Sequence, residues 1–282
     1  MLRFGGPVPE CATVEQWLHT VKRLGYNAVY CPVTFDTPEA LKDEYLAAAR
    51  ENDLVIAEVG AWSNPLAADP AERAQAIEKN IQALALADRM GARCCVNVSG
   101  AKQVSWCGPS KENYDPSTFE EIVARIRHFI DTVQPKHTFY TIEAMQWATP
   151  DSVDDYLRLL EAVDRPQFAV HLDPVNLITS PRLYYENAAL LRDAFARLGS
   201  RLRSCHAKDI LLREDFLVHL CETRIGTGML DYKTYLLELS RHPEVPLMLE
   251  HLPDMAQYAL AAEKVRAVAK ETGIAMPQPA ES

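Results

Sequence analysis

Short apolar runs rich in β-branched residues alternate along the chain with longer segments in which apolar residues recur every three or four positions. The short runs predict buried strands, because consecutive apolar positions are typical of parallel strands that are covered on both faces. We place these strands at residues 2–4, 27–31, 54–59, 93–98, 138–143, 168–173, 202–206 and 246–250. The longer segments have the period of amphipathic helices that cover such a sheet.

Helix start and stop signals lie between the strands. Thr13 and Gln16 fit a capping box at the start of a helix, and Gly25 is suited to end that helix. Thr37 and Asp69 each precede a proline, which predicts that both residues cap helices whose first turn contains that proline. These signals support one helix between each pair of strands.

The alternation of about eight strands with about eight helices favours a single closed (β/α)8 TIM barrel, with an open doubly wound sheet as the alternative. The open sheet has no supporting motif, because the chain lacks both G-x-G-x-x-G after the first strand and the P-loop pattern G-x-x-x-x-G-K-[ST]. No change in composition marks a domain boundary. We therefore predict one barrel domain over residues 1–276 and a flexible C-terminal tail over residues 277–282.

One polar residue closes each of the last four apolar runs: Glu143, Asp173, His206 and Glu250. In a (β/α)8 barrel all strands end on the same face, so these four side chains are expected to meet there. Three carboxylates at one buried mouth repel each other unless a cation neutralises them. Oxygen donors with one imidazole suit a hard or borderline divalent ion, so we expect Mn²⁺, with Mg²⁺ or Co²⁺ as alternatives.

Four segments around these residues carry a family resemblance. They are residues 141–143 (TIE), 171–176 (HLDPVN), 205–209 (CHAKD) and 248–251 (MLEH). The segments resemble the metal-binding strands of the xylose isomerase-like TIM barrels, the sugar phosphate isomerase/epimerase superfamily, and the resemblance covers nearly the whole chain. The loops at residues 60–66 (GAWSNPL) and 226–232 (GTGMLDY) are also similar to loops of that superfamily.

The resemblance implies that Glu143, Asp173, His206 and Glu250 are metal ligands. In the ketose 3-epimerases of this superfamily the two glutamates also act as the acid/base pair. Abstracting a proton next to a carbonyl needs a positioned base and stabilisation of the resulting enediolate, which a divalent metal provides. We therefore expect a metal-dependent sugar isomerase or epimerase, ketose 3-epimerase-like, with Glu143 and Glu250 as its catalytic residues.

Departures from the epimerase pattern keep other functions open. Ketose 3-epimerases commonly have a histidine where this chain has Asn176, and we match the arginine that follows their metal histidine to Arg224. The pair His206 and Lys208 resembles the inosose dehydratase-like branch. That resemblance implies, as the alternative, a lyase or dehydratase acting on a keto-sugar, a keto-cyclitol (inosose) or a 3-keto glycoside. A non-catalytic carbohydrate-binding or accessory subunit is the third hypothesis.

Further side chains are candidates to bind the substrate. Trp62 and Trp147 follow strand ends and have rings that stack on sugars, and Asn97 closes a strand with an amide that binds hydroxyls. Glu58 closes another strand, but nothing separates it from a capping residue. The full set is Trp62, Asn97, Trp147, His171, Asn176, Lys208 and Arg224.

Strand alternation decides which neighbours of the metal ligands face the site. His171 lies two residues before the metal aspartate and Lys208 two residues after the metal histidine, so both are expected to face inward. Lys208 then polarises a substrate oxygen or pairs with a metal carboxylate, unless it is an exposed lysine at the barrel rim. His251 directly follows the last metal glutamate, which places it on the helix-facing side and outside the site.

Composition and charge narrow the classes of partner. The 282 residues include 29 Lys and Arg against 39 Asp and Glu, and the formal net charge of -10 opposes binding to nucleic acid or an anionic membrane. No apolar run approaches the ~18 residues of a membrane helix, and the N-terminus lacks the apolar stretch of a signal peptide. Seven scattered cysteines indicate reduced thiols. We expect a cytoplasmic protein that binds a small-molecule carbohydrate.

Endonuclease IV, a nuclease that acts on damaged DNA, shares this barrel type. Its trinuclear zinc site needs several further histidines on early strands, whereas between residues 1 and 97 this chain has only His19. We therefore exclude a role in DNA repair. By analogy with the same barrels we expect a homo-oligomer, either a dimer or a tetramer.

Overall fold

The computed structural model of the protein describes residues 1–103 and 106–280. Eight strands close into a barrel in the order β1-β10-β7-β6-β5-β4-β3-β2, and all neighbouring strands are parallel. The strands are β1 (Arg3–Gly6), β2 (Ala28–Tyr30), β3 (Val55–Gly60), β4 (Cys94–Asn97), β5 (Tyr140–Glu143), β6 (Phe168–Leu172), β7 (Leu202–Ala207) and β10 (Pro246–Leu249). The prediction of a single (β/α)8 barrel is confirmed.

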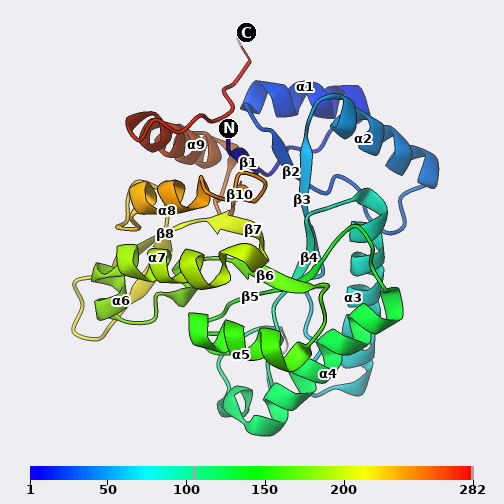
Figure 1. Ribbon diagram of the computed structural model, residues 1–282, viewed down its shortest axis with the longest axis vertical. Coiled ribbons are helices and arrows are strands. Elements are labelled where there is room, and N and C mark those ends of the chain that lie inside the picture. The colour runs from blue at the N-terminus through cyan, green and yellow to red at the C-terminus, as the bar shows by residue number, and fades with distance from the viewer. Residues whose placement is uncertain (104–105, 281–282) are drawn as a thin grey trace.

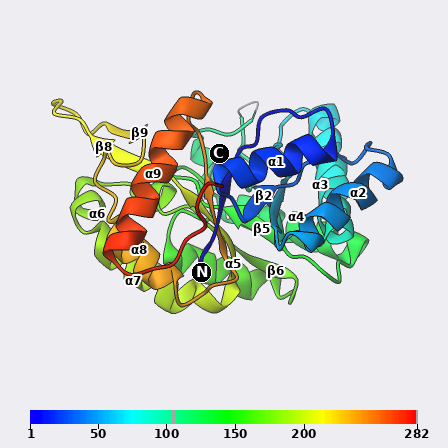
Figure 2. The same ribbon diagram turned by 90° about the horizontal axis from the view of Figure 1, so that it is seen from above.

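Helices surround the barrel on its outside, as Figures 1 and 2 show. They are α1 (Val14–Leu24), α2 (Glu39–Glu51), α3 (Pro70–Met90), α4 (Pro116–Val133), α5 (Val153–Val163), α6 (Pro181–Tyr185), α7 (Asn187–Leu198), α8 (Tyr232–Leu239) and α9 (Met255–Glu271). Three short 3-10 helices are η1 (Lys111–Tyr114), η2 (Val175–Leu177) and η3 (Gly199–Arg201). Apolar residues of the strands and helices form one core between the barrel and this ring.

Most of the expected helix boundaries are confirmed. Thr13 Oγ1 accepts a hydrogen bond from the Gln16 amide, and Gly25 ends α1 with a φ of 66°. Asp69 caps α3 by accepting from two backbone amides of its first turn. The prediction for Thr37 is wrong, because α2 begins at Glu39 and the Thr37 hydroxyl accepts from the Thr34 amide in the preceding turn.

The interior of the barrel changes from apolar to polar along the strands. Ala28, Ala57 and Met248 form a small apolar cluster inside it. The register pairs Met248 of β10 with His206 of β7, and Glu143 of β5 with His171 of β6. Polar side chains therefore enter the barrel from several strands near their carboxyl ends, where active sites of such barrels lie.

An antiparallel hairpin, β8 (Asp209–Leu212) with β9 (Leu220–Thr223), follows β7 and is not among the predicted elements. Figure 2 shows the hairpin projecting from the barrel body. It begins directly after the candidate site residues on β7. At the other end of the chain, the Ala280 amide donates to the Lys22 carbonyl, so residues 277–280 of the expected tail pack against the end of α1. In the described part of the chain, no helix is long and apolar enough to cross a membrane.

Candidate metal centre

The structure brings Glu143, Asp173, His206 and Glu250 together at the carboxyl ends of β5, β6, β7 and β10. One potential ligand atom from each of the four residues lies within 4.8 Å of the others. His206 Nδ1 is 3.1 Å from Glu143 Oε1, 3.0 Å from Glu250 Oε2 and 4.0 Å from Asp173 Oδ2. The first three residues are buried and Glu250 is partly exposed, so the cluster lies at the bottom of the barrel mouth.

Local contacts fix the direction of the carboxylates. Asp173 follows the last residue of β6, and its Oδ1 accepts a hydrogen bond from the Val175 amide at the start of η2. Asn176 Nδ2 donates to Glu143 Oε1 over 3.1 Å. Asn176 therefore orients one of the four candidate ligands, and its binding of substrate stays a prediction.

The donor set fits a divalent metal ion. Asp173 Oδ2 and Glu250 Oε2 are buried and accept no well-directed hydrogen bond from the described residues. The cation nearest to both oxygens is Lys208, and its single positive charge does not balance three carboxylates, so a metal ion would add the charge that the buried cluster needs. Three carboxylates and one imidazole nitrogen, directed at a common point, can hold an ion that prefers oxygen and nitrogen donors.

Lys208 is buried among the carboxylates of the cluster. Its Nζ lies 2.8 Å from Asp173 Oδ2, 2.7 Å from Glu250 Oε2 and 3.7 Å from Glu143 Oε1. Burial raises the pKa of Asp173 to about 6, although the nearby Lys208 ammonium opposes this shift. The interpretation of Lys208 as an exposed lysine at the rim is wrong, and its pairing with carboxylates of the cluster is confirmed.

Glu58 binds the nitrogen of His206 that faces away from the four-residue cluster. The Glu58 carboxylate lies 3.3 Å from His206 Nε2 and 3.2 Å from His171 Nε2, and it accepts a hydrogen bond from Ser204 Oγ over 2.6 Å. Burial alone would raise the pKa of Glu58, but the two histidines hold it below its usual value. With Nε2 bound to Glu58, the other nitrogen of His206 faces the cluster, which is how carboxylates orient metal-binding histidines.

Sequence reasoning missed this role of Glu58. The signal was an acidic residue within an apolar strand, but its partners lie on β6 and β7, on the other side of the barrel. His171 faces inward as expected, and its ring packs edge-on against that of His206 with centroids 4.1 Å apart. Glu58 and Ser204 therefore complete a buried network beneath the four candidate ligands.

The placement of His251 differs from the prediction. β10 ends at Leu249, and His251 has a positive φ of 56°, so strand alternation no longer applies there. Its side chain turns back to the mouth, where Nδ1 lies 3.1 Å from Glu222 Oε2 and Nε2 lies 3.4 Å from Glu250 Oε1. His251 is therefore at the edge of the site rather than on the helix side.

Two of the other candidates contact the loop that follows β3: Trp62 lies in this loop, and Asn97 ends the neighbouring strand β4. Asn97 Oδ1 accepts a hydrogen bond from the backbone amide of Ser63, and Asn97 Nδ2 donates to the Ser63 carbonyl and to Asn80 Oδ1. The Asn97 side chain therefore holds this loop in place. Trp62 lies against Gly60 and lines a cavity of about 470 Å³ that Glu58 also reaches. Binding of substrate by these residues remains a prediction.

Trp147 and Arg224 lie on loops after β5 and β9. The Trp147 carbonyl accepts from Asn113 Nδ2, and its indole lies beside the Cys107 thiol. The Arg224 guanidinium donates to the Ile225 carbonyl of its own loop and makes no ion pair with the described residues. The structure thus gives neither residue a contact with the four candidate ligands, and their role in substrate binding remains a prediction.

Asp209 organises the loop that carries Arg224. Its carboxylate accepts hydrogen bonds from the amides of Gly226, Gly228 and Leu230 at 2.9–3.0 Å. A side chain at Gly228 would collide with Asp209, since a Cβ there would lie 2.4 Å from Oδ1. The motif of residues 205–209 and the loop at 226–232 are therefore one structural unit beside the site.

Comparison with known protein families shows to which family the chain belongs. The family model described as xylose isomerase-like TIM barrel matches residues 18–275. The chain belongs to this family. No curated protein matches the chain.

Solved barrels of this type match nearly the whole chain at low sequence identity. D-psicose 3-epimerase from Clostridium cellulolyticum H10, solved with D-tagatose, is 12% identical, with a TM-score of 0.69 over 97% of this chain and 100% of that chain. The probable 3-DHS dehydratase from Bacillus anthracis is 16% identical, with a TM-score of 0.71 over 95% of this chain and 99% of that chain. At these identities the similarity shows the fold.

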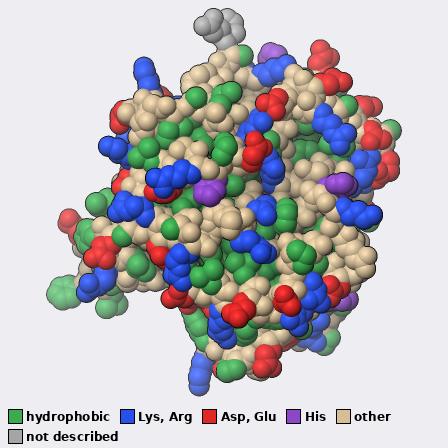
Figure 3. All heavy atoms as spheres, in the orientation of Figure 1, with side chains coloured by type: hydrophobic (Ala, Val, Ile, Leu, Met, Phe, Trp, Pro, Cys, Tyr) green, Lys and Arg blue, Asp and Glu red, His purple; other side chains and the backbone are tan. Residues whose placement is uncertain are grey.

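Endonuclease IV from Thermus thermophilus is also similar, at 14% identity and a TM-score of 0.72 over 95% of this chain and 99% of that chain. Proteins with this fold thus include both sugar epimerases and an endonuclease. The fold alone therefore does not decide the function of this chain, which has to be argued from the side chains of its site. Figure 3 shows acidic and basic side chains interspersed over the face in view, without a continuous basic area there.

Proposed function

We propose that the protein is a divalent-metal-dependent sugar isomerase or epimerase, ketose 3-epimerase-like, that abstracts a proton next to a carbonyl. The observation that carries this proposal is the convergence of Glu143, Asp173, His206 and Glu250 within 4.8 Å at the barrel mouth, with two carboxylate oxygens left without a directed hydrogen bond. Mn²⁺ is the ion we expect, with Mg²⁺ or Co²⁺ as alternatives.

The arrangement of the two glutamates suits proton transfer at one carbon. Glu143 comes from β5 and Glu250 from the end of β10, with β6 and β7 between them in the barrel. The two carboxylates therefore reach the cluster from different sides, as is needed to remove a proton from one face of a carbon and return it to the other. A bound divalent ion would supply the charge that stabilises the enediolate.

A second candidate function is a lyase or dehydratase on a keto-sugar, an inosose or a 3-keto glycoside. The observation that favours it is the buried Lys208 ammonium beside the cluster. In this reaction a glutamate would remove the proton next to the carbonyl, and Lys208 would give a proton to the departing oxygen, so that water or an alcohol leaves. A non-catalytic carbohydrate-binding or accessory subunit is a third and weaker candidate.

The test is turnover of keto-sugars, inososes and 3-keto glycosides with added Mn²⁺ in D₂O, followed by NMR. Deuterium at the substrate carbon with an inverted centre supports the epimerase, and loss of water or of a glycone supports the lyase. Glu143→Gln and Glu250→Gln should each abolish turnover, whereas Glu222→Gln, at the edge of the mouth, should retain it. If both ligand variants keep full turnover, the proposed mechanism is wrong. Equilibrium dialysis that shows sugar binding without metal or turnover would support the binding protein.

We also propose that the protein forms a homo-oligomer, a dimer or a tetramer, since related barrels often pair through helices and loops at the catalytic face. Light scattering after size exclusion measures the mass of the particle. A mass of one chain, 31.6 kDa, would contradict this proposal.

A further inference from the structure

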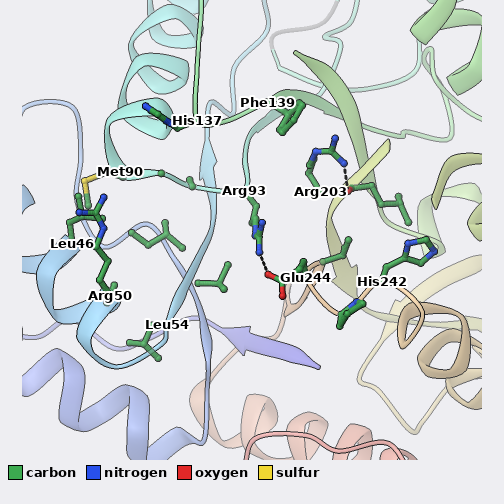
Figure 4. Close-up of a pocket in the computed structure, with 18 of the residues that line it drawn as sticks. Leu46, Arg50, Leu54, Met90, Arg93, His137, Phe139, Arg203, His242 and Glu244 are labelled. Carbon is green, nitrogen blue, oxygen red and sulfur yellow. Dashed lines mark hydrogen bonds and ion pairs between the residues drawn. The ribbon is translucent and has the colours of Figure 1, made fainter. Parts of the chain in front are cut away.

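A second large cavity lies at the opposite end of the barrel from the candidate metal centre. It has a volume of about 640 Å³, within the usual range of about 300–1,000 Å³ for small-molecule sites. Its walls come from the residues that start β3 and β7, precede β4, β5 and β10, and end α2 and α3. Figure 4 shows these side chains around the cavity. Since barrel active sites lie at the other face, this cavity belongs to a different site.

The cavity is basic although the protein is acidic. Three arginines, Arg50, Arg93 and Arg203, line it together with His137, whereas its only carboxylate among the described lining residues is Glu244. A second histidine, His242, also lines it. The net charge of the whole chain is -10, so a cavity with this excess of cations does not follow from composition.

Arg203 is a cation of this cavity without a carboxylate partner among the described residues, as is Arg50. Its guanidinium stacks on the ring of Phe139 at 3.9 Å and donates to the Leu202 carbonyl over 2.7 Å. It has no carboxylate partner among the described residues, whereas Arg93 pairs with Glu244. Burial, together with the charges of Arg201 and Arg93, lowers the pKa of Arg203, so its charge is under-compensated.

Helix ends explain only part of this charge. The C-terminal ends of α2 and α3 lie beside the cavity, and their partial negative charge favours nearby cations such as Arg50 in the last turn of α2. Arg203 lies at the start of β7 and stacks on an aromatic ring, so this effect does not account for its position. The part of the wall away from Arg203 is lined by Leu46, Leu54 and Met90 together with Arg50, as Figure 4 shows.

We propose that this cavity binds a small organic anion, a phosphate monoester or a carboxylate with a planar apolar body. The anionic group would lie between Arg203 and Arg93, because guanidinium groups bind phosphate and carboxylate oxygens through paired hydrogen bonds. The planar body would pack against the apolar wall. The proposal is independent of the reaction at the mouth, because the two sites share no residue.

The test is calorimetric titration of the full, metal-free protein with phenyl phosphate, benzoate and phenol. We expect saturable binding of at least one of the two anions and none of phenol. Tighter binding of phenyl phosphate identifies the ligand class as phosphate esters, and tighter binding of benzoate identifies it as carboxylates. Failure of both anions to bind at millimolar concentration overturns the proposal, as does equal binding of phenol.

Variants locate the binding. Arg203→Met should weaken binding of the anion at least tenfold, and Arg50→Gln, at an exposed residue of the cavity wall, should weaken it several-fold. Arg158→Met is the matched control, because Arg158 also stacks on a phenylalanine, Phe119, at 3.6 Å, but outside this cavity. Unchanged affinity in both Arg203→Met and Arg50→Gln, or equal weakening in Arg158→Met, would show that the anion binds elsewhere.

Discussion

The Lys208 ammonium lies 2.8 Å from Asp173 Oδ2 in the interior of the barrel mouth. The same Nζ lies 2.7 Å from Glu250 Oε2, so one ammonium pairs with two of the three carboxylates that form the candidate metal centre. The three carboxylates raise the pKa of Lys208, against the opposing effect of its burial, and it stays charged. Lys208 therefore stabilises a cluster that would otherwise carry uncompensated negative charge.

Replacing Lys208 by methionine should destabilise the metal-free protein by about 3–5 kcal/mol, because it leaves buried carboxylates without their cation. Mn²⁺ at saturating concentration should reduce this loss, since a divalent ion supplies the missing positive charge and binds only the folded state. Urea unfolding with a chelator and with Mn²⁺ measures both values. Lys102→Met, which removes a less buried lysine from its pair with Glu121, serves as the control. A loss in Lys208→Met that is the same with and without metal would contradict this account.

Glu58→Gln should weaken Mn²⁺ binding by roughly 10–100-fold, because the variant removes the charged partner that orients His206. Calorimetric titration with Mn²⁺ gives this affinity directly. The control is Glu238→Gln, which alters a buried glutamate of α8 that pairs with Arg241 outside the mouth. If Glu58→Gln binds Mn²⁺ as tightly as the unchanged protein, Glu58 has no positioning role.

The strands and the meeting of the four candidate ligands could be predicted because both depend on local patterns. Apolar runs define each strand, and the polar residue that closes each run lies on the same barrel face by topology. The bond between Glu58 and His206 could not be predicted in this way, because it joins β3 to β7 across the barrel. The position of His251 could not be predicted either. It depends on a positive φ after the end of β10, where the alternation of side chains along a strand no longer applies.

The basic cavity at the other barrel end also escaped sequence analysis. Arg50, Arg93 and Arg203 lie far apart in an acidic chain, and no spacing rule links them. Only the closure of the barrel brings the starts of β3, β4 and β7 around one cavity. The meeting of charged residues from distant parts of the chain was therefore predictable at the strand ends, where a polar residue closes each apolar run, and not at the strand starts.

Asp209→Ala should destabilise the protein by about 1–3 kcal/mol, because the amides of Gly226, Gly228 and Leu230 lose their common acceptor. The loop at residues 226–232 should lose its protection against hydrogen exchange first. Urea unfolding gives the energy, and exchange followed by mass spectrometry gives the location. Asp69→Asn is the control, because asparagine caps a helix as well as aspartate does. Unchanged protection of the loop would show that Asp209 does not hold it.

Glu121 links α4 to the loop after β4 in a pH-dependent way. Its carboxylate pairs with Lys102 at 2.6 Å and with Arg125 at 3.2 Å. Burial alone would raise the pKa of Glu121, but these two cations hold it below the usual value of 4.5. A carboxylate with a lowered pKa in the folded state adds stability above its unfolded pKa and loses it as the pH falls through the folded pKa.

Glu121→Gln should therefore cost about 0.5–1 kcal/mol at neutral pH, the upper part of the range for partly exposed ion pairs. The cost should shrink towards zero as the pH falls below 4.5, because the unchanged protein then loses the same charge by protonation. Urea unfolding of both proteins across this pH range measures the difference. Glu120→Gln, at the exposed neighbour on α4 without an ion pair among the described residues, should show no such trend. A cost in Glu121→Gln that grows with acidity would mean that the carboxylate does not act through Lys102 and Arg125.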